Sequence, residues 1–362
     1  MNLVHVADVG DGLCMALGTL SRRVIQIDVG GKDPRVALSG LQRIVSRLGA
    51  PDVFVLSHFH IDHYSGLLQG SVRSGFPFGI TEVFFPRIPE FVGRSTFLEY
   101  LFAMNARVFG SETGIMEYDL LKAISRINEG QPFRSRSLSK GETINIGGSI
   151  LEILWPPKTI EEKKTLTSIK RAIDDFEKAM DVDEETRLAY QSLRQDKVYR
   201  SYLEDNEGIR EETEPDSHNN QRIKCERGKL PEAVKKANES LRSAANHLSL
   251  ALFEDNRLLF LGDTESYEIK RIVKDLMAKD RTFFMNLITP HHGTHWHRSL
   301  RQINCINSIT SNGKKLCSGM REEMKEISEM SYATFANGDV ILPKQNANTF
   351  WNPSVARAKT ID

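Results

Sequence analysis

Residues 53–63 read Val-Phe-Val-Leu-Ser-His-Phe-His-Ile-Asp-His, an apolar run that leads directly into three histidines and one aspartate. The apolar part predicts a buried strand, and the polar side chains follow where it ends. Imidazoles and carboxylates at this density are typical of metal sites, and only 10 of the 362 residues are histidine. One cation would take His58 and His60, and a second would take Asp62 and His63. The alternative is a polar loop that carries histidine by chance.

Two further apolar strands end in residues that bind metals. Leu258–Leu261 is followed by Asp263, and Leu287–Thr289 is followed by His291 and His292. Ligands gather beyond the carboxyl ends of strands in layered α/β folds, so the three strand ends predict one shared site. In that site the Asp263 carboxylate would bridge two cations, which lowers their mutual repulsion and fixes their separation.

The composition is that of a globular protein with a sizeable core. The chain is 40% hydrophobic and has a formal net charge of zero, which argues against tight nonspecific nucleic-acid binding but leaves a local basic groove open. Its four cysteines have no CxxC spacing and are expected to be reduced and mostly packed. We find neither a signal peptide nor an apolar run of the roughly 18 residues that span a bilayer. A soluble, cytoplasmic protein without a membrane partner is expected.

Composition divides the chain into three parts. Residues 1–157 alternate strand and helix patterns. Residues 158–245 are rich in charged side chains and predict a charged, largely helical insertion, with a mobile loop at Glu211–Asn220. Residues 246–362 resume the α/β pattern. We favour a solvated insertion without chemistry; the alternatives are a cap over the site or an arm that binds a partner protein.

Individual elements can be placed by periodicity. Apolar residues recur at helical spacing over Pro34–Leu48 and Tyr267–Met277. A strand is expected over Leu248–Phe253, turning at Glu254–Asn256 into the strand that ends in Asp263.

The order of the motifs resembles that of a known superfamily. His-x-His-x-Asp-His at 58–63, Gly-Asp at 262–263 and His-His-Gly at 291–293 look like the motifs of the metallo-β-lactamase fold superfamily. Shorter stretches resemble the metallo-hydrolase domain of bacterial DNA-uptake (competence) proteins and their stand-alone relatives. These stretches are Asp8–Gly10, Ile27–Gly30, Leu154–Pro157, Asn246 with Ser249, and Thr289–Gly293. The likeness covers residues 1–157 and 246–343, and implies an αββα sandwich of the metallo-β-lactamase type with a charged helical insertion and metals at one edge.

The resemblance implies roles for the first set of motif residues. His58 and His60 would bind the first metal, and Asp62 and His63 the second. Asp263 would bridge the two ions, and Asp263 and Asp62 would orient the attacking water or accept its proton.

Roles also follow for residues outside that set. One of His291 and His292 would complete the second metal site, and Asp28 would orient a ligating imidazole from behind. His295 and His297 come just after the His-His-Gly motif. Both would either supply a ligand, contact substrate or lie on the surface.

Two departures from the family pattern affect these expectations. Many members supply another histidine between the positions of His63 and Asp263, where this chain has His218, inside the insertion, and His247, which we expect to lie at the entry of a strand. The first metal therefore lacks an obvious third histidine. The Gly-His-Pro common near the end of the DNA-uptake branch is also missing, since Ser311-Asn312-Gly313 continues into two lysines.

The function predicted is a two-metal hydrolase whose nucleophile is a hydroxide that bridges two divalent ions, Zn²⁺ or Mn²⁺. The favoured substrate is a phosphodiester in DNA, RNA or a nucleotide, so a nuclease or phosphodiesterase. Basic residues of the first segment could contact phosphates or simply be solvated: Arg22, Arg23, Lys32, Arg35, Arg43 and Arg47. One alternative is hydrolysis of a lactone, thioester or amide; another is a metal-binding partner module without catalysis.

Overall fold

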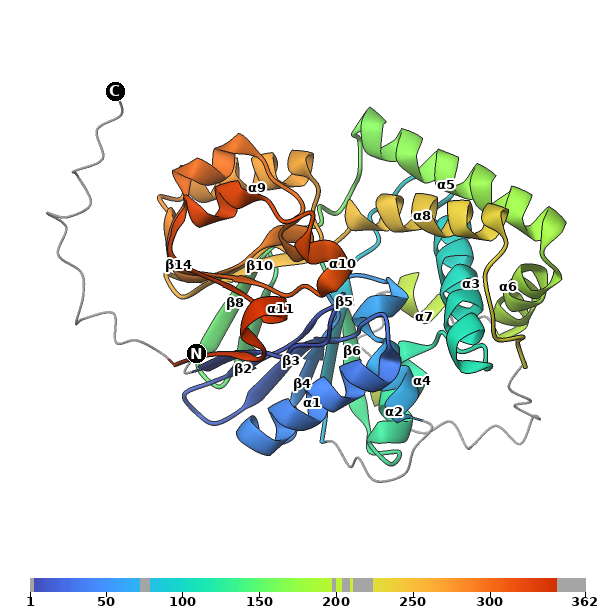
Figure 1. Ribbon diagram of the computed structural model, residues 1–362, viewed down its shortest axis with the longest axis horizontal. Helices are drawn as coiled ribbons and strands as arrows, with labels where there is room; N and C mark the ends of the chain where they lie inside the picture. Colours follow the sequence, from blue (N-terminus) through green and yellow to red (C-terminus); the bar gives the residue numbers. More distant parts are fainter. Residues whose placement is uncertain (1–2, 72–78, 197–199, 204–208, 211–223, 344–362) are drawn as a thin grey trace, which may run out of the picture.

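Two β-sheets lie face to face, and helices cover the outer face of each (Figure 1). The computed structural model describes residues 3–71, 79–196, 200–203, 209–210 and 224–343. The expected α/β fold with αββα layers is thus confirmed. The loop predicted at Glu211–Asn220 lies outside the described residues. Within the described ranges, no helix has the length and apolarity to cross a bilayer.

The first sheet has eight strands and brings the two ends of the described chain together. Strands β3 to β6 run parallel to one another, whereas β1 is antiparallel to both of its neighbours. Across the sheet the order is β15 (Val340–Pro343), β1 (Leu3–Val6), β2 (Cys14–Gly18), β3 (Val24–Val29), β4 (Val53–Val55), β5 (Glu82–Pro86), β6 (Phe133–Leu138) and β9 (Ile209–Arg210).

The second sheet has seven strands, and β11 to β14 run parallel. Strands β10 and β11 form the antiparallel hairpin expected from the sequence. The strand expected from Leu248 begins only at Ala251, because the amides of Leu248 and Ser249 bond back to the preceding helix. The order is β14 (Ser328–Ala333), β13 (Asn304–Thr310), β12 (Phe283–Ile288), β11 (Leu258–Phe260), β10 (Ala251–Glu254), β8 (Ser149–Trp155) and β7 (Thr143–Ile146).

The alternation of side chains along the strands builds three cores. Val53 and Val55 of β4 point between the sheets, while Phe54 points to the helices outside. In the same way Phe260 of β11 points between the sheets and Leu259 points outward. Successive residues of a strand face opposite sides, so each sheet buries both faces.

Helices from two regions cover the first sheet. Those of the first part are α1 (Pro34–Leu48), α2 (Ser65–Gly70), α3 (Arg94–Thr113) and α4 (Leu120–Ile127). Those after residue 158 are α5 (Lys163–Val182), α6 (Glu184–Asp196), α7 (Arg200–Leu203) and α8 (Glu232–Asn246). Phe176 of α5 stacks on Tyr100 of α3 with ring centroids 4.4 Å apart, so the charged segment shares the hydrophobic core of the first part.

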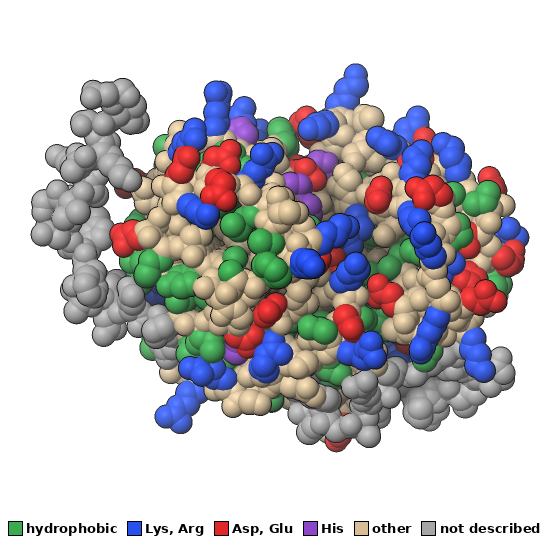
Figure 2. Space-filling model, viewed as in Figure 1, with side chains coloured by type: hydrophobic (Ala, Val, Ile, Leu, Met, Phe, Trp, Pro, Cys, Tyr) green, Lys and Arg blue, Asp and Glu red, His purple; other side chains and the backbone are tan. Residues whose placement is uncertain are grey.

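The second sheet is covered by α9 (Ser266–Ala278), and short helices α10 (Lys314–Cys317) and α11 (Thr334–Asn337) follow near the end. All four cysteines are free, and three of them are buried, as expected for packed thiols. Histidine side chains reach the surface in a hollow near the middle of one face, with Lys and Arg side chains beside them (Figure 2).

Candidate metal centre

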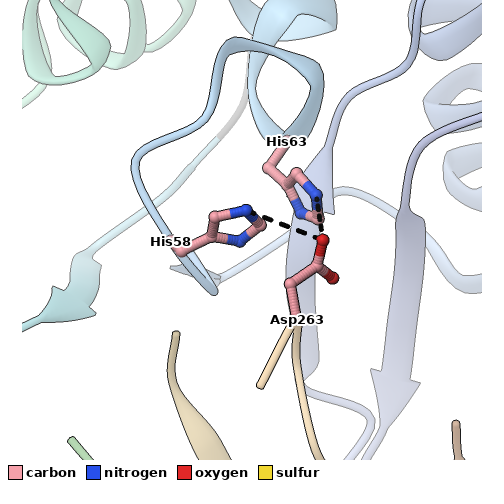
Figure 3. A group of neighbouring side chains, drawn as sticks. All are labelled: His58, His63 and Asp263. Carbon is pink, nitrogen blue, oxygen red and sulfur yellow. Dashed lines mark ion pairs between the residues drawn. The ribbon is translucent and has the colours of Figure 1, made fainter. Parts of the chain in front are cut away.

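Three strand ends meet at one place, as the sequence predicted. β4 leads into the loop that carries His58 and His63, β11 leads to Asp263, and β12 leads to His291 and His292. β4 belongs to the first sheet and the other two strands to the second. His58 and His63 point toward the Asp263 carboxylate from the opposite sheet (Figure 3).

One oxygen of Asp263 lies at the middle of this group. Oδ2 is 3.8 Å from Nε2 of His58, 3.6 Å from that of His63, 3.6 Å from that of His291 and 3.5 Å from that of His292. None of these distances is a hydrogen bond, and this buried oxygen has no hydrogen-bond partner among the described residues. A buried carboxylate oxygen surrounded by imidazoles but bonded to none needs an explanation.

The group fits a divalent transition metal. One ligand atom each from His58, His63 and Asp263 lie within 4.8 Å of one another. An ion with bonds of about 2 Å in tetrahedral geometry holds its ligand atoms roughly 3.3 Å apart, close to the distances found. Nε2 of His63 and Nε2 of His60 are also buried without a hydrogen-bond partner in the described part of the chain. Mixed histidine and carboxylate donors suit zinc and manganese.

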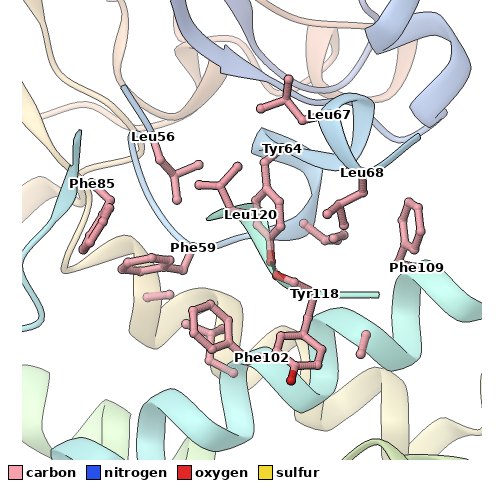
Figure 4. Packing of buried hydrophobic residues seen from close by; sticks show 14 of the residues in the cluster. Leu56, Phe59, Tyr64, Leu67, Leu68, Phe85, Phe102, Phe109, Tyr118 and Leu120 are labelled. Carbon is pink, nitrogen blue, oxygen red and sulfur yellow. Dashed lines mark hydrogen bonds between the residues drawn. The ribbon is translucent and has the colours of Figure 1, made fainter. Parts of the chain in front are cut away.

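Phe59 anchors the histidine loop by packing among buried hydrophobic side chains, with Phe85 and Phe102 nearby (Figure 4). Its ring packs edge-on against Phe102 of α3, with centroids 5.5 Å apart. Asn105 of the same helix donates to the Phe59 carbonyl at 2.6 Å and to the Tyr64 hydroxyl at 3.0 Å. These contacts tie the loop to α3 on its core side, which leaves His58 and His60 directed toward the centre.

Asp28, at the end of β3, supports His63 from behind. Its Oδ2 lies 2.7 Å from Nδ1 of His63, and its Oδ1 accepts from the Ser57 amide at 2.7 Å. The Ser57 hydroxyl also donates to Asp28. A carboxylate on one ring nitrogen sets the tautomer and directs the other nitrogen to a metal, so Asp28 lies where the predicted supporting role requires.

His291 and His292 adopt an unusual backbone conformation. Their φ angles are 45° and 56°, in the left-handed region that residues other than glycine rarely occupy. His292 is held by its Nδ1, which lies 2.8 Å from the Ser311 carbonyl. Such conformations concentrate at functional sites, and here they turn Nε2 of both rings toward Asp263.

Burial and the surrounding charges set the protonation of the centre. Burial lowers the pKa values of His58 and His60 well below the usual range, so both rings are neutral at neutral pH. Burial opposes protonation of His63 as well, but the carboxylates of Asp28 and Asp263 raise its pKa to about 10. Burial would raise the pKa of Asp263, yet the imidazoles around it hold that pKa well below its ordinary value.

Asp62 does not join the group around Asp263. Its Oδ1 and Oδ2 accept from Nη1 and Nη2 of Arg242 at 2.9 and 2.8 Å. Burial would raise the pKa of Asp62, but Arg242, together with His63, lowers it well below the ordinary range. The structure therefore differs from the sequence-based expectation that Asp62 faces a cation together with His63.

Of the remaining residues predicted from the sequence, two lie next to the metal centre and one does not. Nδ1 of His60 lies 2.7 Å from Nε2 of His58, and Nε2 of His295 lies 2.8 Å from Nδ1 of His291, so both adjoin the centre. His297 does not: its Nδ1 accepts from the Ser299 amide at the start of a 3₁₀ helix, Arg298–Gln302.

Arg242 is the site residue that sequence reasoning missed. A signal was present, because residues four apart share one face of a helix and Asn246 belongs to a motif already singled out. In the structure Nδ2 of Asn246 lies 3.5 Å from Nε2 of His291, and Arg242 lies one turn before it on α8. Asn105 carried no such signal, since nothing in its local sequence marks it.

No protein-family model matches the chain, and no curated protein matches it. Solved structures with a similar arrangement include the metallo-β-lactamase fold protein YhfI from Bacillus subtilis, 10% identical over 95% of this chain and 100% of that one, with a TM-score of 0.39. Zn²⁺-bound PqqB from Methylobacterium extorquens is 10% identical over 94% and 100%, with a TM-score of 0.41. MEM-A1, a subclass B3 metallo-β-lactamase from a soil metagenome, is 16% identical over 42% of this chain and 48% of that one, with a TM-score of 0.25.

The chain thus spans about half the length of the B3 enzyme. The αββα architecture described above rests on this chain's own strand order and packing. The resemblance to DNA-uptake proteins is addressed by none of these three matches and stays a prediction.

A cavity of about 830 Å³ lies between the start of α1 and the end of α3. Lys32 and Asp33 form part of its wall, and they follow Gly30, whose added Cβ would overlap the backbone of Asp62 and His63. Its charged lining is balanced: Lys32, Arg35, Arg227 and Lys314 with Asp11, Asp33, Glu112 and Glu117.

Several basic residues considered for phosphate contact already have acidic partners in the structure. Arg23 pairs with Asp52, Arg35 with Asp33 and Arg43 with Asp339.

Proposed function

We propose that this chain is a metal-dependent hydrolase with its catalytic centre at Asp263. The observation that supports it most is the buried, unpartnered Oδ2 of Asp263, with four imidazole nitrogens 3.5–3.8 Å away. His58, His63 and Asp263 would hold a divalent cation, with His292 beside them. A bound cation of this kind supplies Lewis acidity, which activates water and stabilises negative charge on the substrate.

The chain's own residues define the direction of approach. The side chains of His58, His63 and Asp263 are at most 4% exposed, whereas that of His291 is 22% exposed and that of Arg242 is 32% exposed. Substrate therefore reaches the centre past His291 and Arg242. The buried side keeps out bulk water and strengthens the electrostatic interactions within the centre.

The substrate we propose is a phosphodiester of a nucleotide or nucleic acid. Arg242 stands on the accessible side of the centre. Its Nη1 and Nη2 each donate to Asp62, but a guanidinium carries five N–H donors, so two such bonds leave others that match phosphate oxygens in geometry. A phosphodiester brings a negative charge to this side, whereas a lactone, thioester or amide does not.

Assays of purified protein with Zn²⁺ or Mn²⁺ test this proposal. We expect hydrolysis of bis(p-nitrophenyl) phosphate or of a nucleic acid, and a loss of at least about a thousandfold in Asp263→Asn, because a Lewis acid contributes several kcal/mol. Asp255→Asn is the matched control, since that acid lies on the exposed turn of the same hairpin, 54% exposed. Activity on p-nitrophenyl esters alone would overturn the phosphodiester assignment. Full activity in Asp263→Asn would overturn the centre itself.

A further inference from the structure

Arg242 and Asp62 form a two-pronged ion pair beside the centre. Each terminal nitrogen of the guanidinium donates to a different oxygen of the carboxylate, at 2.9 and 2.8 Å. The Arg242 side chain is 32% exposed and that of Asp62 is 17% exposed, so solvent reaches only part of the pair. This parallel geometry is the strongest form of an arginine–carboxylate contact, and it occupies both oxygens of Asp62.

The helix that presents Arg242 is held in place along its length. α8 packs on α5, and its Leu241 is fully buried. Ser240 donates to Asp175 of α5 at 2.7 Å, and Lys236 pairs with the same carboxylate at 3.1 Å. The Arg242 guanidinium therefore reaches Asp62 from a helix whose position is fixed by its packing and hydrogen bonds.

The residues expected to hold a second cation converge only in part, because the histidines lie around Asp263 whereas Asp62 is bonded to Arg242. That set was Asp62, His63 and one of His291 and His292. Among the described residues, the group whose ligand atoms come together is His58, His63 and Asp263, without Asp62. A cation on Asp62 would have to displace the Arg242 guanidinium or lie against its positive charge, and like charges at short range repel strongly.

We propose that the centre holds one divalent cation and that the Arg242 guanidinium takes the place of a second cation on Asp62. This inference rests on the proposed metal centre. A helix of the 158–245 segment thus supplies a permanent positive charge where the expected two-metal arrangement would use an ion. Arginine keeps that charge at any physiological pH and cannot be removed by a chelator.

Metal stoichiometry tests the proposal without any assay of activity. Protein is dialysed to equilibrium against Zn²⁺, and in parallel against Mn²⁺, and bound metal per chain is measured by plasma mass spectrometry. We expect one ion in the wild type and two in Arg242→Ala and Arg242→Gln, where Asp62 is free. The double variant Arg242→Ala/Asp62→Asn should return to one.

Two further variants serve as controls. Lys235→Ala removes a cation from the same helix that pairs with the exposed Glu232 and should stay at one ion per chain. Asp62→Asn alone should also stay at one, because Asp62 does not hold the first ion. Circular dichroism on every variant verifies that it is folded, and the Gln variant preserves side-chain bulk in case the Ala variant is unstable.

Several outcomes would overturn the inference. Two ions in the wild type would show that Arg242 does not exclude the second, and a single ion in both folded Arg242 variants would show that it is not what limits the site. Loss of the ion in Asp62→Asn would make Asp62 a ligand of the first site. No bound metal in the wild type would instead overturn the proposed metal centre itself.

Discussion

Asp28 and His63 form a buried pair in which the carboxylate lies 2.7 Å from Nδ1, while Nε2 on the other side of the ring lies 3.6 Å from Asp263. Both side chains are fully buried. The His63 imidazole thus connects Asp28, from the first sheet, with Asp263, which follows a strand of the second sheet.

Replacement of Asp28 should therefore weaken metal binding. We expect Asp28→Asn to raise the dissociation constant for Zn²⁺ about 10- to 100-fold, as for other carboxylates that orient a ligating histidine. The dissociation constant can be measured by competition with a chelating dye. Asp52→Asn is the control, because that acid pairs with Arg23 at the other end of the same strands. Equal affinities for wild type and Asp28→Asn would show that the pair does not orient the ring for metal.

His292 and His297 should behave differently although they lie five positions apart. His292→Ala removes a ring whose Nε2 is 3.5 Å from Asp263, and bound metal per chain should fall well below that of the wild type. His297→Ala removes only a helix-capping contact, so metal content should not change. Bound metal per chain is measured in parallel for the two variants. A similar loss of metal in both would show that His297 also contributes to the metal centre.

Gly30 should tolerate no side chain. An added Cβ would overlap the backbone of Asp62 and His63, so Gly30→Ala must displace the histidine loop. We expect reduced metal binding and a lower midpoint of thermal unfolding, by several degrees. Gly79→Ala has open space around its Cβ and should match the wild type in both measurements. Unchanged metal affinity in Gly30→Ala would mean that the loop shifts without consequence for the centre.

Phe176 links the charged segment to the first part of the chain. Phe176→Ala should cost about 3–5 kcal/mol of stability, because the ring is fully buried against Tyr100. The three tryptophans all lie outside residues 158–245, so their fluorescence reports on the rest of the molecule. If the segment folds cooperatively with it, denaturation followed by fluorescence and by circular dichroism should shift together.

Separate transitions in the two signals would contradict a single cooperative unit. Phe335→Ala is the control for loss of an aromatic ring, since Phe335 is 49% exposed and should change stability by less than about 1 kcal/mol.

Asp339 should make stability depend on acid pH. Burial would raise its pKa, but Arg43 and the other groups that bond to it lower that pKa to about 2, from an ordinary 3.8. The folded state thus binds the proton less tightly than the unfolded state. The contribution of Asp339 to the stability of the folded state is therefore present above pH 3.8 and is lost as the pH falls through 2.

A shift of this size corresponds to about 2 kcal/mol, which solvent screening of the partly exposed pair reduces to about 1. Asp339→Asn should therefore lower the free energy of unfolding at pH 7 and have little effect near pH 2, measured by urea denaturation at both values. Glu326→Gln, in an exposed pair with Arg301, should change little at either pH. A constant difference across the range would exclude ionisation as the cause.

Features set by local chemistry could be predicted from the sequence. Helix α1 has the predicted bounds because Asp33 caps it, Pro34 occupies its first turn and Gly49 ends it. The strand expected at Leu248 began three residues later, since the end of α8 captures the first amides by hydrogen bonds. Competition of this kind between neighbouring elements has no signature in side-chain periodicity.

The sequence by itself predicted the αββα layers through the resemblance of its motif order to a known superfamily. It also predicted the meeting of His58, His63 and Asp263 with His291 or His292, because ligand residues that follow apolar strands gather at one edge of layered sheets. Only the tertiary structure decided the partner of Asp62. Arg242 lies 180 positions along the chain on a helix whose orientation depends on packing against α5 and α3. The sequence around Asp62 has the pattern of a metal ligand whether or not an arginine lies nearby. Whether Asp62 faces an ion or a guanidinium therefore depends on the tertiary structure.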